Sequence, residues 1–535
     1  MTRVVIPAVH QAKANPLDLL AHDGGVTSPI RDLDTDCMYH NTLPIVTGEQ
    51  EYCIVQRPTF ALYSDDSAAG SKQGLGVYNW QGYNMWGIKD TLYYNNGGTT
   101  LALTSLHDYD ARATFTPTSV AGVEKLAIQF PGTSSVDGSV WIQDTPTSVP
   151  ARVTDADMPG NDGTRLIRGV VALNGYLFVC NTAGQLNNSN LDDPTTWTAT
   201  DFRTAERNAD VGCYLGKHKD HVFYLGSTSM EFFYDGANAT GSPLTRRNDI
   251  TYNVGCADPN SVIEIGDLTY FIGLGQDGSP ALYMLDAFNL NKVESTRFDS
   301  LLRQVGFGRY DGTPSTNVYG LINVQNSGLV YVMTVNTGNL SGTYALHIES
   351  GIVSKWYANG TPANENTFDW DVTLPICGST LTNIAVDDGD VSDNKVQFDN
   401  GVVCEMSRAG YGTLADNGLS APEVFFYTIP TSLNETMDRK KVNSIRVQHY
   451  PSVNDTLDPA TLTIEWYDMR TLLTTGVDGA DATMFTQART VDTSTNNAVI
   501  YRCGYTRQRI HKVTLTAGKR QMIKGLEVDF TELRG

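Results

Sequence analysis

Six short segments of the chain share one pattern of polar and apolar positions. Each has a polar turn flanked by two β-prone stretches, and the second stretch carries an aromatic residue at its third position. These aromatics are Tyr93, Trp141, Phe178, Phe223, Tyr270 and Tyr331. Neighbouring aromatics are 37 to 61 residues apart, and a hairpin unit recurring about every 40–50 residues is typical of a β-propeller blade. We therefore expect an all-β protein with a propeller of six or seven blades and these aromatics in the blade cores.

The same pattern divides the chain into three parts. Residues 1–75 look extended and turn-rich, and we expect an N-terminal arm or outer β layer there. Residues 76–430 contain the hairpin units and predict the propeller with inserted loops. Residues 431–535 contain alternating apolar and polar positions, for example over 460–468, which is typical of half-buried strands. We expect a C-terminal antiparallel β module that adds a β-rich platform to the propeller. A β-sandwich or two stacked β domains is the alternative.

Composition agrees with a turn-rich β protein. The 535 residues include 49 glycines, and 41% of the residues are hydrophobic. No apolar run approaches the roughly 20 residues that a membrane-spanning helix needs, and the first residues lack the apolar core of a secretory signal. The eight cysteines form no CxxC pair. We expect reduced, partly buried thiols in a protein made in the cytoplasm.

Charge is distributed unevenly along the chain. The formal net charge is −21. Residues 439–535 hold 14 Lys and Arg and 10 Asp and Glu, a net charge of +4, which leaves −25 for the rest. An acidic surface should not hold nucleic acid tightly, while solubility alone would also favour such a charge. Charge does not separate these two interpretations.

Motifs that carry catalytic or metal chemistry are almost absent. His218 and His221 form an HxxH without the glutamate and helical spacing of a zinc protease. Residues 273–278 read GxGxxG but lead into another strand, where a dinucleotide site needs a helix. The acid-rich stretch is spaced loosely like a calcium loop without the complete EF-hand pattern; its carboxylates are Asp387, Asp388, Asp390 and Asp393. We predict no enzyme, no catalytic, cofactor-binding or metal residues, and no cofactor.

Basic residues cluster at three places. They are Arg246-Arg247, Arg439 to Lys441, and a group formed by Arg507, Arg509 and Lys512. No recognition helix accompanies them, so they are weak evidence for nucleic-acid binding. Protein–protein contact or a solvated face is the better interpretation.

Several short motifs resemble one family of phage proteins. They are Asp193-Pro194-Thr195-Thr196-Trp197, the run from Asn248 to Cys256 with the following Pro259 to Ile272, the Arg57-Pro58 step, and Arg439-Lys440-Lys441. Together they resemble the packaged-DNA stabilisation, or tail nozzle (tail hub), family of short-tailed bacteriophages (podoviruses). The resemblance spans roughly residues 55–450 and is densest over 165–275.

The resemblance implies a structural virion protein of the phage tail, made in the cytoplasm of a bacterial host. Six copies would form a ring below the portal and head-to-tail adaptor, extend the DNA channel, retain packaged DNA and pass it during ejection. Partners would be the adaptor, tail fibre, spike or needle proteins, and transiently the genomic DNA, with no membrane span. The long last interval suggests an inserted loop near 303–317 that contacts a neighbouring subunit. The alternatives are a glycan-binding or glycan-cleaving propeller and a propeller scaffold for protein partners.

Overall fold

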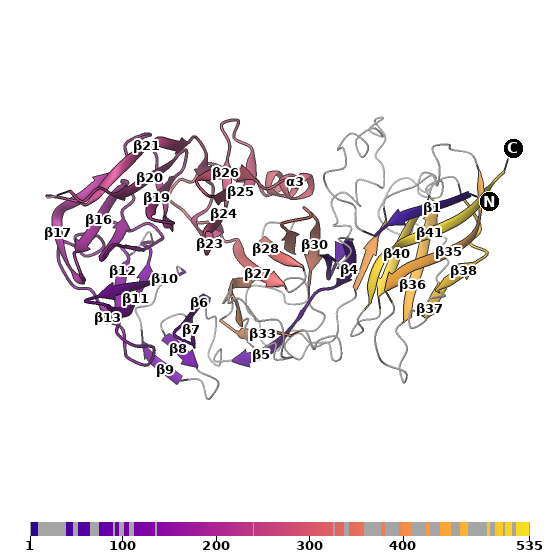
Figure 1. Cartoon of the computed structure of the whole chain (residues 1–535), viewed down its shortest axis with the longest axis horizontal. Coiled ribbons are helices and arrows are strands. Elements are labelled where there is room, and N and C mark those ends of the chain that lie inside the picture. The colour runs from indigo at the N-terminus through magenta and orange to yellow at the C-terminus, as the bar shows by residue number, and fades with distance from the viewer. Residues whose placement is uncertain are drawn as a thin grey trace.

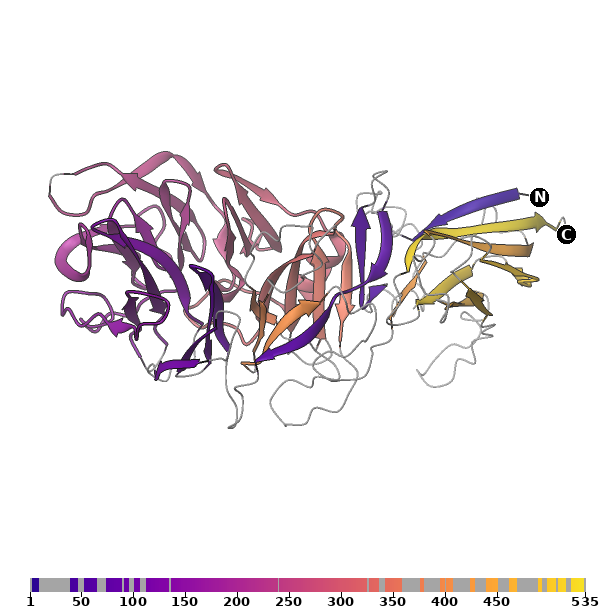
Figure 2. The same cartoon turned by 60° about the horizontal axis from the view of Figure 1, so that its bottom comes forward.

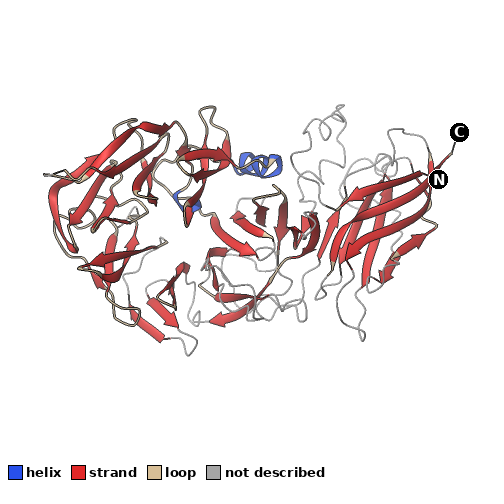
Figure 3. Ribbon diagram, in the orientation of Figure 1, coloured by secondary structure: helices blue, strands red, loops and turns tan. Residues whose placement is uncertain are grey.

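The protein is built almost entirely from β-strands, as the sequence predicts (Figure 3). The computed structural model describes residues 2–8, 39–46, 52–64, 74–88, 91–95, 101–105, 112–133, 136–238, 240–324, 327–335, 342–357, 376–379, 395–399, 401–407, 424–428, 439–450, 461–468, 489–492, 498–506, 509–515 and 521–533. Within these residues the strands form eight sheets. Helix α3 (Thr296–Val305) and the short 3-10 helix η1 (Pro259–Ser261) are the helical elements of the same residues.

Six sheets of four or five strands are propeller blades arranged around a common axis (Figure 1). Five of them use strands in chain order: β6 (Gly74–Trp80), β7 (Tyr83–Ile88), β8 (Thr91–Asn95) and β9 (Leu101–Ser105); β10 (Thr114–Val120), β11 (Val123–Phe130), β12 (Ser139–Gln143) and β13 (Ala151–Arg152); β14 (Val171–Leu173), β15 (Tyr176–Cys180), β16 (Gln185–Asn190) and β17 (Asp193–Thr204); β18 (Gly212–His218), β19 (His221–Gly226), β20 (Met230–Asp235) and β21 (Leu244–Tyr252); β22 (Gly255–Cys256), β23 (Ile263–Ile265), β24 (Leu268–Leu274), β25 (Pro280–Asp286) and β26 (Asn289–Lys292).

The sixth blade joins distant parts of the sequence. Its strands are β31 (Ile376–Ser379), β32 (Lys395–Phe398), β33 (Val403–Ser407) and β5 (Thr59–Ser64). Strand β5 pairs antiparallel with β33, so residues near the N-terminus supply the outer strand of a blade whose other strands come from residues 376–407. Pairing an early strand with late ones completes this blade and joins the two ends of the propeller, which leaves only short edges.

A further four-stranded unit occupies the remaining place in the ring. Its strands are β27 (Val318–Val324), β28 (Gly328–Val335), β29 (Gly342–His347) and β30 (Val353–Trp356), and they begin a nine-stranded sheet. Strand β27 contacts both η1 and β31, and β31 contacts β6. The expectation of six or seven blades is therefore confirmed: six blades are sheets of their own, and β27–β30 stand between two of them.

Tight turns connect many of the strands. The turns Gln81-Gly82, Ala121-Gly122 and Asn174-Gly175 each have positive φ at both residues, from 50° to 83°. Two consecutive residues with positive φ make a type I′ turn, whose twist matches that of paired strands. The Asn-Gly turn is the strongest sequence signal for this geometry, and it lies where the sequence predicts a hairpin.

The six aromatics of the sequence pattern take two positions in the blades. Phe178, Phe223, Tyr270 and Tyr331 lie in the second strand of their sheets, counted from the propeller axis, and are at most 2% exposed. By contrast, Tyr93 and Trp141 lie in the third strands β8 and β12 and are only partly buried. Four of the six are blade core, and the first two units of the pattern are displaced by one strand.

Both ends of the chain build a terminal module beside the ring (Figure 2). One of its sheets contains β3 (Thr42–Val46), β4 (Tyr52–Gln56), β41 (Met522–Glu532), β35 (Lys440–Tyr450) and β38 (Val499–Tyr501), with β1 (Thr2–Pro7) beside β41 and β39 (Tyr505–Thr506) beside β35. The other is the far part of the nine-stranded sheet: β34 (Val424–Tyr427), β40 (Arg509–Leu515), β36 (Thr461–Asp468) and β37 (Arg489–Asp492). Apolar residues of the two sheets form one buried core.

The ring and the terminal module share a sheet. The short strand β2 (Tyr39–His40) pairs parallel with β30 of the ring and antiparallel with β34 of the module. Strands β1, β2, β3 and β4 thus pair with strands of the module and, through β2, of the ring. The predicted domain boundaries at residues 75/76 and 430/431 are not decided by this pairing and stay predictions.

Two further sequence expectations concern cysteines and membranes. Seven cysteines lie in the described part of the chain, and all of them are buried free thiols. In that same part, no helix combines the length and apolar character needed to cross a bilayer.

Candidate functional site

The propeller axis contains a cavity of about 590 Å³. It is lined by the innermost strands of the ring, namely β6, β10, β18, β27, β31 and the segments at β14 and β23. A volume of this size is in the range of small-ligand pockets. Among the described residues that line it, Glu264 is the single carboxylate. A glycan-cleaving site would need two carboxyl groups facing each other, so this cavity does not support that alternative.

The polar centre of the axis is formed by Arg168, Tyr214 and Glu264. Backbone pairing brings the first two together, because the Leu215 amide donates to the Arg168 carbonyl at 2.9 Å. The Arg168 guanidinium lies 5.8 Å from the centre of the Tyr214 ring, and its Nη1 donates to the carbonyl of Pro259 at 2.9 Å. Burial lowers the pKa of Arg168. These contacts hold the segments before β14, in β18 and at η1 in a fixed arrangement.

Glu264 has an unusual protonation equilibrium. Burial raises the pKa of its carboxyl to about 7, although hydrogen bonds from Tyr214 and from the Lys217 backbone oppose this rise. The Lys217 amide donates to Glu264 Oε2 at 3.4 Å. The carboxyl lies over Gly216, where a Cβ atom would come within 2.3 Å of Glu264 Oε1. The arrangement is therefore a proton-sensitive contact between β18 and β23, and one acid without a partner acid or nucleophile gives it no evident catalytic chemistry.

A second buried carboxyl, Asp258, connects three segments. It accepts hydrogen bonds from the Asn260 amide at 3.0 Å and the Tyr319 hydroxyl at 2.9 Å, and it also accepts one from the Ser315 hydroxyl. Burial raises its pKa. Through these bonds Asp258 caps η1 and fixes it to β27 and to the segment that precedes β27. This role is structural, because each bond closes a contact within the protein.

The HxxH histidines lie at the β18–β19 turn and pack around one aromatic ring. The centre of the Phe288 ring is 4.9 Å from that of His218 and 4.7 Å from that of His221. The Phe288 amide donates to His218 Nε2 at 3.2 Å, and Arg247 lies 4.9 Å from the ring centre. Burial lowers the pKa of both histidines, so the neutral form that accepts this bond is favoured. The two histidines thus hold the β25–β26 turn against the neighbouring blade.

The remaining candidate motifs are separated by the fold. Residues 273–278 end β24 and form the turn before β25, as expected, and Ser279 N donates to Asp277 Oδ1 at 3.1 Å there. The acidic positions proposed for a calcium loop, 387–393, lie outside the described residues. Groups of three or more His, Cys, Asp or Glu side chains that could hold a metal do not occur in the residues that the structure describes.

Basic residues of the predicted clusters are used within the protein. Arg246 pairs with buried Glu231 at 2.9 Å. The Arg439 guanidinium lies 4.8 Å from the centre of the Tyr505 ring. Buried Arg509 donates to the Cys503 carbonyl at 2.8 Å. Arg507 lies outside the described residues. These contacts favour the structural interpretation of the clusters over a nucleic-acid surface.

The Arg57-Pro58 step proves to be the junction between ring and module. Arg57 is 2% exposed. Its Nε donates to Asn41 Oδ1 at 2.9 Å, Nη1 to the Pro58 carbonyl at 2.8 Å and Nη2 to the Tyr357 carbonyl at 3.0 Å. The guanidinium also lies 5.8 Å from the centre of the Trp356 ring at the end of β30. One side chain between β4 and β5 therefore binds the residue that connects β2 to β3 and the residue that follows β30.

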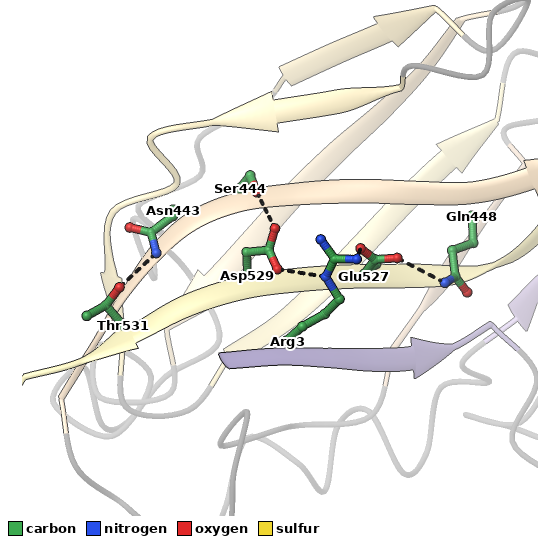
Figure 4. A network of polar contacts seen from close by, with 7 residues as sticks. All are labelled: Arg3, Asn443, Ser444, Gln448, Glu527, Asp529 and Thr531. Carbon is green, nitrogen blue, oxygen red and sulfur yellow. Dashed lines mark hydrogen bonds and ion pairs between the residues drawn. The ribbon is translucent and has the colours of Figure 1, made fainter. Parts of the chain in front are cut away.

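The first and last strands of the chain are joined by a network that the sequence analysis missed (Figure 4). Arg3 on β1 forms ion pairs with Glu527 at 2.8 Å and with Asp529 at 3.0 Å. Ser444 and Gln448 of β35 donate to the same two carboxylates at 3.1 and 3.3 Å. The hydrogen bond from Arg3 lowers the pKa of Asp529. We call this network the terminal clasp. Its signal in the sequence is weak, because the partners are more than 500 residues apart.

Comparison with protein families assigns part of the ring. Residues 135–310 match the model of the Phage_stabilise family, described as "Bacteriophage P22 Gp10, beta-propeller". The matched segment includes three complete blades, β14–β17, β18–β21 and β22–β26, and helix α3. The resemblance to a phage stabilisation family is thereby confirmed. No curated protein matches the chain.

Three solved structures that overlap much of this chain, at low sequence identity, come from different organisms. The extracellular domain of a hybrid two component system from B. thetaiotaomicron covers 74% of this chain at 10% identity and a TM-score of 0.37, and this chain spans 43% of that one. BamB from Moraxella catarrhalis covers 65% of this chain, with 98% of its own length, 10% identity and a TM-score of 0.33. The WD40 domain of Pan2 from Neurospora crassa covers 66%, with 95% of its own length, 9% identity and a TM-score of 0.36.

Proposed function

Starting from the phage stabilisation family that residues 135–310 match, we propose that this chain is the tail nozzle of a short-tailed bacteriophage. Six copies form a hexamer below the portal and the head-to-tail adaptor. This hexamer extends the DNA channel, retains the packaged genome and passes it during ejection. Its outer surface offers docking places for fibres, spikes or needle proteins. The family match is the observation that carries the proposal.

The net charge supports the passage of DNA through such a hexamer. Each copy carries a formal charge of −21, and six copies bring six times that charge around the channel. Tight binding of DNA requires neutralisation of its phosphates by Lys and Arg. Several basic residues that the sequence brings together are instead buried or paired, as with Arg509 and Arg246. An acidic channel would let the DNA slide without being held.

The continuous nine-stranded sheet also suits a protein that must carry load. Because β2 pairs with both β30 and β34, a force on the terminal module passes into the propeller of the same chain through backbone hydrogen bonds. A flexible linker between the two parts would not transmit it. We therefore propose that ring and module act as one body in the tail.

Labelling the protein in virions tests the proposal. A short peptide tag fits in the Ala121-Gly122 turn, because nothing lies within 4 Å of a Cβ built on Gly122. Electron microscopy of virions with gold bound to this tag should show label at the tail, in six copies below the portal. Label on the capsid, or virions without label, would refute the nozzle. A tagged virion of normal infectivity is the control that the insertion leaves the fold intact.

A further inference from the structure

Among the described residues, no carboxylate forms an ion pair with Arg168 at the propeller axis. The Arg168 side chain lines the cavity of about 590 Å³. Its Nη1 donates to the Pro259 carbonyl at 2.9 Å, whereas Nε and Nη2 donate to none of the residues that the structure describes. Asp258 and Glu264 attract this charge only from a greater distance, and burial disfavours it. A buried cation with an unused edge is stabilised by an anion that reaches this edge.

The described wall of this cavity carries a net positive charge. Its charged residues are Arg168, Lys217 and Glu264, so two positive charges face one carboxyl and the net charge is +1 when that carboxyl is ionised. Burial raises the pKa of Glu264 to about 7, so near neutral pH the carboxyl is partly protonated and the wall is more positive still. The chain as a whole carries −21. A positive cavity in a strongly acidic protein favours a ligand of negative charge.

Part of the cavity wall is apolar. Tyr78 and Phe115 both line the cavity, and their rings stack with centres 5.7 Å apart. Leu321 adds an aliphatic side chain from another blade. At one end the lining residues Lys217 and Gly266 are exposed, so the cavity opens to solvent there. An apolar surface with a few polar groups, in a cavity of this volume, is typical of a site for a small organic ligand.

We propose that the propeller axis binds a small organic acid, with its carboxylate or phosphate on Arg168 and its apolar part against Tyr78 and Phe115. Lys217 attracts the acid at the open end of the cavity. The Thr114 hydroxyl lines the same cavity, lacks a hydrogen-bond partner among the described residues, and can donate to the ligand. The site lies within one chain, so this inference goes beyond the nozzle and does not depend on assembly into a hexamer.

Glu264 makes the binding of an acid depend on pH. The charged or titratable groups that act on its carboxyl are Tyr214, Arg168 and Lys217. A bound anion in the same cavity raises the pKa of Glu264 further, because like charges disfavour ionisation. By linkage, the acid binds more tightly when Glu264 is protonated, and binding near pH 7 takes up part of a proton. The affinity should therefore fall about tenfold from pH 6 to pH 8, and Glu264→Gln should remove this dependence.

Saturation-transfer NMR and titration calorimetry of the full chain test the site. The probes are benzoate and phenyl phosphate, with benzyl alcohol as the uncharged control. At least one of the two acids should bind with a Kd below about 1 mM, and the alcohol should bind at least tenfold more weakly. Binding of one acid and not the other identifies the acidic group that the site takes. No binding of either acid, or equally strong binding of the alcohol, would overturn the proposal.

Substitutions in the cavity locate the bound acid. Arg168→Gln should weaken its binding about tenfold or more, because a hydrogen bond between two charged groups is lost. Lys217→Gln alters an exposed side chain, leaves the fold intact even if Arg168→Gln does not, and should weaken binding about two- to fivefold. Lys219→Gln, exposed two residues further along and outside the cavity lining, is the matched control and should bind as the parent does. Unchanged affinity in Lys217→Gln, or a pH dependence that persists in Glu264→Gln, would refute the assignment of the acid to this cavity.

Discussion

The ring and the terminal module are both β structure, but they are assembled in opposite ways. A blade such as β14–β17 pairs strands that follow one another between residues 171 and 204. In the module, β1 (Thr2–Pro7) pairs with β41 (Met522–Glu532). Local pairing repeats with a period that is visible in the sequence, whereas pairing between the two chain ends leaves no such period. The sequence pattern therefore predicts the blades of the ring, whereas for the module it predicts single strands without their pairing.

The two regions nevertheless share their structure at one place. Strand β2 joins β30 to β34, and Arg57 bonds to Asn41, Pro58 and Tyr357 beside that junction. Because backbone pairing continues from one region into the other, we expect them to unfold in one transition. Single substitutions on each side of the junction and within it test how far the stability of one region depends on the other.

The largest effect is expected at the propeller axis, with a matched glycine in the module. Gly169 has φ of 114°, and a Cβ atom there would lie 1.8 Å from the Leu215 carbonyl oxygen. Gly504 also has a positive φ, 79°, but the atom nearest to its Cβ would be Arg509 Nη2, 3.9 Å away. Gly169→Ala should lower the free energy of unfolding by more than about 4 kcal/mol, since backbone atoms must move. Gly504→Ala should cost about 1 kcal/mol from strain alone.

Urea denaturation followed by tryptophan fluorescence measures both variants. If the two substitutions lower the free energy of unfolding equally, the close contact between the segments at Gly169 and Leu215 does not make the propeller more sensitive than the module to an added Cβ atom. A Gly169→Ala protein that fails to accumulate would agree with the prediction, provided that Gly504→Ala accumulates normally.

Loss of the junction side chain is expected to be the next largest effect. Arg57→Leu removes one buried donor from each of the acceptors on Asn41, Pro58 and Tyr357, which should cost about 3 kcal/mol. Differential scanning calorimetry should then show two transitions in place of one, because the two-residue strand β2 is a short connection once the junction side chain is lost. Arg152→Leu removes an exposed arginine that bonds to Asn161 at 3.2 Å and should leave the transition unchanged. A single, unshifted transition for Arg57→Leu would show that β2 alone couples the regions.

Sequence patterns predicted the ring well because its contacts are local. The Asn174-Gly175 turn and the buried Phe178 that follows lie where the hairpin pattern requires. The displacement of Tyr93 and Trp141 into third strands could not be foreseen, because a hairpin pattern does not say which two strands of a blade it describes. The sequence pattern predicts a loop near 303–317, whereas the structure has helix α3 over Thr296–Val305. Its signals in the sequence are the capping residue Ser295 and Gly306, which ends the helix in the left-handed conformation.

The polar sites were less predictable than the fold. Glu264 lies in an ordinary alternating strand, and its raised pKa arises from burial against another strand, which the hydrogen bonds from Tyr214 and Lys217 only partly offset. In the sequence, the Arg57-Pro58 step stands out only as a family motif. The burial of this arginine among carbonyl and amide acceptors depends on residues that the fold brings together. Side chains that act through distant partners need the folded geometry before their role can be assigned.

Protonation of Glu264 at the propeller axis should make the free energy of unfolding depend on pH, and we expect no equivalent effect from the module. The pKa of Glu264 is raised to about 7 in the folded state, above its usual value near 4.3. The folded protein therefore holds this proton more tightly, so its stability is greatest below about pH 4.3 and falls as the pH rises towards 7. Because glutamine does not titrate, Glu264→Gln should remove this fall, which is on the order of 3 kcal/mol, and the variant should be more stable than the parent at pH 8.

Subtracting the stability curves of parent and variant from pH 4 to pH 8 isolates the effect of Glu264 from other titrating groups. A difference that is constant across this range would mean that the carboxyl has an ordinary pKa. Glu465→Gln in the module, whose carboxylate pairs with Lys512 at 3.7 Å, is a comparison substitution outside the axis and should not reproduce the rise at pH 8.

The smallest effect is expected at the terminal clasp, although it joins the two ends of the chain. Arg3 is exposed, with 58% of its side chain accessible, so water and salt screen its ion pairs with Glu527 and Asp529. Arg3→Ala should shift the denaturation midpoint only slightly, and the shift should vanish at high salt. The pKa of Asp529 should rise towards its usual value, which carboxyl NMR can follow. A large, salt-independent loss of stability would instead mean that β1 is held mainly by this side chain, and not by the six backbone pairs with β41 and the burial of Ile6.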